Sequence, residues 1–67
     1  MINEALKAIE SYKSNAIIMN FVNTESLKKV AAEISANPSR VCTPADIEER
    51  VADYVRLGLI GIYMAAQ

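Results

Sequence analysis

Apolar residues near the start of the chain follow the spacing of a helix. In the segment INEALKAIESY they recur at intervals of three and four, which places one set on a single side: Ile2, Ala5, Leu6 and Ile9. Asn3 and Glu4 suit a first helical turn. Glu10 and Lys13 fall outside the apolar side. We therefore expect a helix over this segment, with the apolar side turned inward.

The helical spacing degrades after Ser14 and Asn15. If one helix continued through this point, Lys13 would enter the apolar stripe while Val22 pointed away from it. The segment AIIMNFV that follows is apolar on two sides, as expected if two neighbours cover it. We expect a helix that continues or restarts after Ser14, with a short strand as the alternative.

A second helical pattern occupies NTESLKKVAAEISAN. Asn23 or Thr24 can cap its first N–H groups, and Glu25 suits the positive end of the helix dipole. The expected core stripe follows the i, i+3, i+4, i+7 spacing: Leu27, Val30, Ala31 and Ile34. Asn37 should end this helix, because the residue before a proline is pushed out of the α region and Asn tolerates a left-handed cap.

The third helix has the clearest start signal. Thr43 supplies a capping hydroxyl, Pro44 takes the first helical position, and Asp46 can reach back to complete a capping box. No proline interrupts the chain from there to about Ala65. One side of this long helix should face the core: Ile47, Val51, Tyr54, Val55, Gly58, Leu59 and Ile62.

The opposite side of the third helix changes from polar to apolar along its length. It reads Asp46, Glu49 and Asp53, and then Leu57, Ile60 and Met64. Positions 53, 57, 60 and 64 have the spacing of a helix–helix seam. Two preceding helices can cover only one side, so a second surface is needed, and the glycines at 58 and 61 favour close backbone approach. The predicted interface comprises Leu57, Ile60, Gly61, Tyr63 and Met64. The alternative is a helix that ends near Gly58, followed by a strand or a frayed tail.

The length of the chain favours one domain over residues 1–67, whose small core leaves the monomer marginal. One cysteine allows no internal disulfide, and the lack of histidine removes the usual zinc sites. Self-association or binding to a partner is the remaining way to stabilise so short a chain. The sequence predicts an all-α fold, a small bundle of three or four helices with a long C-terminal helix, completed by self-association.

Charge and hydropathy limit the compartments and binding partners that we expect for the protein. The formal net charge is −1, whereas binding to nucleic acid or anionic membrane normally requires a basic excess. Glu4 stands where a secretory signal would be basic. The apolar stretch at 57–66 has about half the length of a membrane helix. We expect a cytoplasmic protein, with no membrane contact and no nucleic acid partner.

Candidate catalytic chemistry is sparse. Without histidine, the serine and cysteine nucleophiles that depend on imidazole cannot be assembled. Cys42 precedes a helix N-terminus, where a thiol pKa falls, but the chain offers it neither a second cysteine nor a base, so we interpret it as a structural or incidental thiol. The acids after Thr43 suit a solvated face, where Asp46 can pair with Arg50, and Asp53 with Arg56. We expect no enzyme activity, no cofactor and no metal.

One stretch resembles a known family. SLKKVAAEIS, a turn and then TPADIEERVADYVRLGLI are similar to the helix-turn-helix half of a winged-helix domain, over residues 26–62. The resemblance implies a DNA-binding regulator. The chain departs from the pattern, because the loop at 36–42 is long and no segment follows to form the wing. The would-be recognition helix also opens with Asp46, Glu48 and Glu49, which would face phosphates.

These patterns together predict a small non-enzymatic regulatory or adaptor protein. It would form a homodimer or higher oligomer through the C-terminal helix and act by contacting another protein. Two alternatives remain from the sequence: a DNA-binding regulator with a truncated winged-helix-like fold, and an enzyme subunit that contributes surface rather than chemistry.

Overall fold

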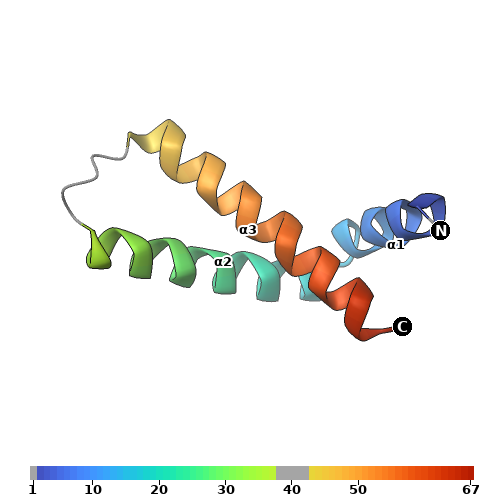
Figure 1. Ribbon diagram of the computed structural model, residues 1–67. Coiled ribbons are helices and arrows are strands. Elements are labelled where there is room, and N and C mark those ends of the chain that lie inside the picture. Colours follow the sequence, from blue (N-terminus) through green and yellow to red (C-terminus); the bar gives the residue numbers. More distant parts are fainter. Residues whose placement is uncertain (1, 38–42) are drawn as a thin grey trace.

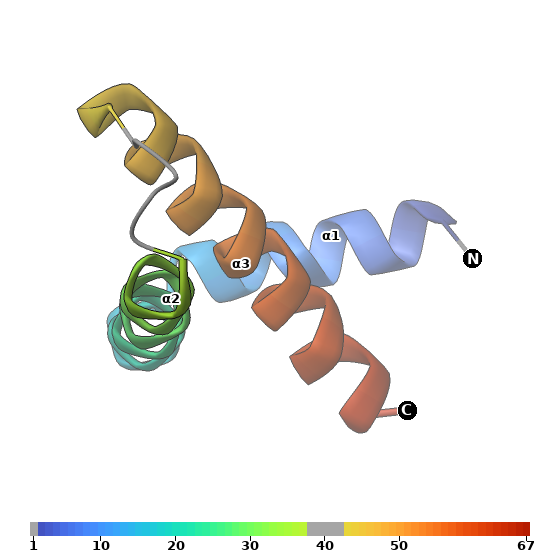
Figure 2. The ribbon, with the colours of Figure 1, turned by 60° about the vertical axis from the view of Figure 1, so that its left-hand side comes forward.

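The part of the chain that the structure describes folds into three helices around a small core. The computed structural model describes residues 2–37 and 43–67. Its helices are α1 (Ile2–Lys13), α2 (Ala16–Ala36) and α3 (Pro44–Ala65). α3 runs back across α2, and α1 packs against both, so the described chain begins and ends at the same end of the molecule (Figures 1 and 2). The predicted all-α class, with a long C-terminal helix, is confirmed.

Asn15 separates α1 from α2. Its side-chain oxygen accepts hydrogen bonds from the backbone N–H groups of Ile17 and Ile18, at 3.0 and 3.1 Å, and so caps the second helix. The restarted helix is therefore confirmed, and the strand alternative is wrong. The expected start at Asn23 or Thr24 is also wrong, because both lie inside α2.

The buried stripe of α2 differs from the one predicted. It consists of Val22, Ser26 and Val30, whereas Leu27 is 56% exposed and Ala31 is also exposed. Ser26 tolerates burial because its hydroxyl donates to the Val22 carbonyl oxygen at 2.7 Å. The stripe is displaced because α3 crosses α2 at Gly58, where an added Cβ would lie 3.1 Å from Val22 Cγ1. This close approach brings the Val22 side of α2 to the core.

α3 begins and ends as the sequence predicts. Thr43 accepts from the Asp46 N–H at 3.2 Å, and Asp46 accepts from the Thr43 N–H at 3.3 Å, which completes the capping box. The helix continues to Ala65, so the alternative of a strand or frayed tail after Gly58 is wrong. Leu59 is fully buried, and the other predicted core positions of α3 are half-buried.

Two further predictions, one for α1 and one for the end of α2, are wrong. Ile2 and Leu6 were expected to face inward but are 79% and 56% exposed, because α1 packs through its half-buried alanines together with Ile9 and Tyr12. Asn37 ends α2 with φ of −143° rather than in the left-handed region. Pro38 lies outside the described residues.

The capping box at the start of α3 should make a measurable contribution to the free energy of unfolding. Thr43→Ala is expected to lower the free energy of unfolding by about 1 kcal/mol, because the Asp46 N–H loses its acceptor at the helix end. Thermal denaturation measures this change. The matched control is Thr24→Ala, an exposed threonine inside α2, where alanine is the better helix former. Equal losses for both variants would contradict the capping role.

Candidate interaction surface

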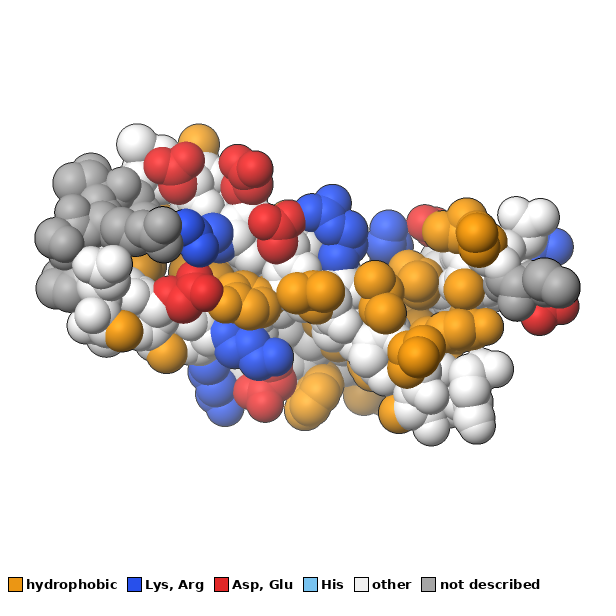
Figure 3. All heavy atoms as spheres, in the orientation of Figure 1, with side chains coloured by type: hydrophobic (Ala, Val, Ile, Leu, Met, Phe, Trp, Pro, Cys, Tyr) orange, Lys and Arg blue, Asp and Glu red, His pale blue; other side chains and the backbone are white. Residues whose placement is uncertain are grey.

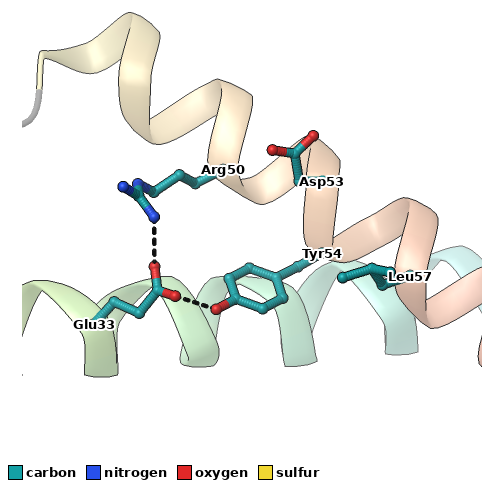
Figure 4. Close-up of a pocket in the computed structure, with 5 residues that line it drawn as sticks. All are labelled: Glu33, Arg50, Asp53, Tyr54 and Leu57. Carbon is teal, nitrogen blue, oxygen red and sulfur yellow. Dashed lines mark hydrogen bonds and ion pairs between the residues drawn. The ribbon is translucent and has the colours of Figure 1, made fainter.

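A polar cluster joins the last turn of α2 to the middle of α3. Glu33 of α2 accepts a hydrogen bond from Arg50 Nη1 at 3.2 Å through one carboxylate oxygen, and one from the Tyr54 hydroxyl through the other (Figure 4). The Arg50 and Glu33 side chains are 39% and 40% exposed. Arg50 thus pairs across the helices with Glu33, and the predicted Asp46–Arg50 pair is wrong. The expected Asp53–Arg56 pair is present.

The electrostatics of this cluster centre on Tyr54. Its hydrogen bond to the Glu33 carboxylate raises the pKa of Tyr54 above its ordinary value, because a phenolate there would lose the bond and face a negative charge. Arg50 opposes the shift. The Lys29 ammonium lies 5.7 Å from the centre of the Tyr54 ring, on the α2 side. Carboxylate, guanidinium and phenol satisfy one another, so the cluster acts as a clamp between α2 and α3.

Shallow hollows lie on either side of this clamp. One of about 230 Å³ is lined by Glu33, Arg50, Asp53, Tyr54 and Leu57. Another of about 190 Å³ is lined by Tyr54 and residues of both helices, among them Phe21, Lys29 and Ile62. Glu33, Arg50 and Tyr54 in the first hollow are paired with one another, and Asp53 pairs with Arg56. The hollow therefore offers a shaped surface for a partner rather than a reactive centre.

Alkaline pH should weaken the clamp. Because the folded-state pKa of Tyr54 is raised, its contribution to stability is present below the unfolded value, about 10, and is lost as the pH rises through the folded value. We expect the melting temperature to fall as the pH rises above about 10. Tyr54→Phe should be less stable at neutral pH and show a shallower decline. An unchanged slope in this variant would assign the pH dependence to other groups.

Four residues of the predicted interface, Leu57, Ile60, Gly61 and Met64, are exposed on α3, whereas Tyr63 lies one helical turn from Leu59 on the core side. Leu57, Ile60 and Met64 are 62%, 45% and 66% exposed, Gly61 is also exposed, and Tyr63 is half-buried. Three large apolar side chains therefore stand in a row without cover from the described chain. We name Leu57, Ile60 and Met64 the outer seam.

The outer seam has a polar continuation on the same side of α3. Asp46, Glu49 and Asp53 are exposed at the N-terminal half of the helix. Figure 3 shows acidic side chains over that half, and hydrophobic side chains gathered where the C-terminal half of α3 and α1 lie. The change from a charged to an apolar surface along one helix is thus a feature of the folded molecule.

Sequence reasoning missed the exposed apolar side chains of the other helices. These are Ile2 and Leu6 on α1, and Ile17, Phe21 and Leu27 on α2. The two-sided apolar character of AIIMNFV is the signal that could have found the pair at the start of α2.

Two classes of site find no support among the described residues. In residues 2–37 and 43–67, no three acidic, cysteine or histidine side chains come close enough together to hold a metal ion. None of the helices in that part of the chain combines the length and hydropathy of a membrane span. Cys42 lies outside the described residues.

Comparison with known proteins adds no assignment. No protein-family model, curated protein or solved structure matches the chain.

Proposed function

We propose that this chain is a small non-enzymatic protein that self-associates through the C-terminal half of α3 and acts by protein–protein interaction, as an adaptor or regulator. The observation that carries the proposal is the outer seam, whose large apolar side chains are 45–66% exposed. Contiguous apolar surface of this kind marks binding sites on small proteins.

The molecule exposes more surface than a compact monomer of its size. The chain exposes 5125 Å², whereas a compact monomer of 7.3 kDa exposes about 4,200 Å². Its three helices therefore leave more surface open to a partner than a compact fold of this length would. The radius of gyration, 13.5 Å, likewise exceeds the roughly 11 Å of a compact domain of this length.

Self-association would relieve the shortage of core. Only Val22, Val30 and Leu59 are buried hydrophobic residues among those the structure describes, so the monomer has little apolar burial to oppose its conformational entropy. Pairing two outer seams adds apolar burial without any change in fold. The exposed apolar side chains of α2 then remain available to bind a different protein.

Sedimentation of the purified chain tests the proposal. We expect a homodimer or higher oligomer at micromolar concentration, with a melting temperature that rises with protein concentration, since subunit binding stabilises the folded state. A monomer at these concentrations, with a melting temperature independent of concentration, contradicts the proposal.

A DNA-binding assay separates this function from the winged-helix alternative. We expect no change in the electrophoretic mobility of duplex DNA at about 150 mM salt. The start of α3 carries the acidic residues Asp46, Glu48 and Glu49, which would repel DNA phosphates. The double variant Lys28→Ala, Lys29→Ala is the control. A shift by the parent chain that this variant abolishes would favour the DNA-binding alternative.

A further inference from the structure

Gly61 has no structural role within its own chain. Gly58 lies against Val22, but at Gly61 an added Cβ would meet no atom within 4 Å. Gly61 is exposed and lies inside α3, where glycine weakens a helix relative to alanine. An interior glycine without an intramolecular neighbour permits another backbone to approach. The place where it occurs, beside Ile60 in the middle of the outer seam, indicates where a second copy crosses.

The outer seam is symmetric about that place. Leu57 and Met64 lie equally far along the helix on either side of the midpoint between Ile60 and Gly61. A two-fold axis through this midpoint would run α3 antiparallel to its copy and set Leu57 level with Met64 of the second copy. The two Ile60 side chains would meet beside the axis. Such an isologous pairing closes as a dimer.

The acidic half of α3 decides between antiparallel and parallel pairing. In a parallel pair, Asp46, Glu49 and Asp53 would each face their own copy at a helix separation of about 8–10 Å, which is within the screening length at physiological salt. In the antiparallel pair the two Asp53 residues are offset by about 22 Å along the helix axis, at 1.5 Å per residue. Like-charge repulsion therefore disfavours the parallel arrangement.

We infer that two copies of this chain pair through antiparallel α3 helices that cross between Ile60 and Gly61, with Leu57 packed against Met64 of the second copy. The outer seams of the two copies thus pack against each other. Figure 3 shows hydrophobic side chains gathered where the C-terminal half of α3 and α1 lie, so the crossing falls within an apolar part of the surface. The inference rests on the proposed self-association and adds its direction and register.

Disulfide trapping tests the direction. In a Cys42→Ser background, Leu57→Cys and Met64→Cys chains are prepared separately, mixed and mildly oxidised. The antiparallel pair predicts a 57–64 cross-link in the mixture and little cross-linking of either chain alone, because like positions would lie about 10 Å apart along the axis, beyond the reach of a disulfide. Efficient cross-linking of each chain alone indicates a parallel pair and overturns the inference while leaving self-association intact. If the unmodified chain sediments as a monomer, the proposed function fails as well.

Gly61→Ala provides a second test, which does not depend on cysteine reactivity. Within one chain the new methyl group meets open space, so helix formation is favoured and the melting temperature of dilute protein should rise. At the crossing the same methyl group separates the backbones, so the dimer dissociation constant should increase several-fold. Gly58→Ala is the matched control, since its Cβ would lie 3.1 Å from Val22 Cγ1 of the same chain and should leave the dimer dissociation constant close to that of the parent. Unchanged or tighter association of Gly61→Ala overturns the assigned crossing point.

Discussion

Ile60→Asp is expected to dissociate the assembly. Ile60 is half-exposed in the single chain, at 45%, so a carboxylate there remains solvated and costs the monomer little. In the proposed dimer the two Ile60 side chains meet beside the two-fold axis, and each substitution removes about 1.5–3 kcal/mol of apolar burial while placing two negative charges together. Self-association should therefore weaken at least about 100-fold, since each 1.4 kcal/mol is a factor of ten.

Sedimentation across a concentration series measures this loss. The matched control is Ala52→Asp, which introduces the same charge at another exposed position of α3, outside the outer seam. The control should associate like the parent chain, and Ile60→Asp should sediment as a monomer whose helix content is unchanged. If Ile60→Asp assembles and melts like the parent, the interface lies elsewhere on the molecule.

The helix ends could be predicted because their signals are local. Thr43, Pro44 and Asp46 interact within one turn, so the capping box is legible from their order alone. Asn15 is an equally good cap, and the break in helical spacing after Ser14 pointed to it. The outer seam was likewise predicted by spacing within one helix, and its exposure agrees with a side that the other helices leave uncovered.

The register of α2 could not be predicted because it depends on contacts far apart in the sequence. Leu27 fits the helical spacing of its segment as well as Val30 does, but only Val30 is buried. The choice is made where Gly58 of α3 comes within contact distance of Val22, which draws Ser26 into the core. A small polar residue in a buried stripe has no local signal, because its burial follows from how closely the other helix approaches.

The clamp was hidden for the same reason. Arg50 has Asp46 one helical turn away, and the i, i+4 spacing favours that pair. In the folded chain Glu33 of α2 comes within reach and Asp46 is engaged with Thr43 at the helix start, so Arg50 pairs with Glu33. Packing between helices and the demands of the cap thus outweigh the local pairing rule, and neither can be read from one segment.

A pair of leucines two residues apart should separate folding from assembly. Leu59 is fully buried at the contact between the helices, whereas Leu57 is 62% exposed on the outer seam. Leu59→Ala is expected to lower the free energy of unfolding by about 2–5 kcal/mol, because it removes buried apolar contacts and leaves a cavity. For a chain with so few buried hydrophobic residues, this loss approaches the whole stability of a small domain.

Leu57→Ala is the matched substitution, and it should weaken dimerisation rather than the stability of the monomer. At low concentration, where the chain is monomeric, its urea midpoint should stay close to that of the parent. Its dimer dissociation constant should increase about tenfold or more, because the leucine is buried only by the second copy. Leu59→Ala should instead lower the midpoint at every concentration. If Leu57→Ala destabilises the monomer as much as Leu59→Ala does, then Leu57 belongs to the core and the outer seam is not an interface.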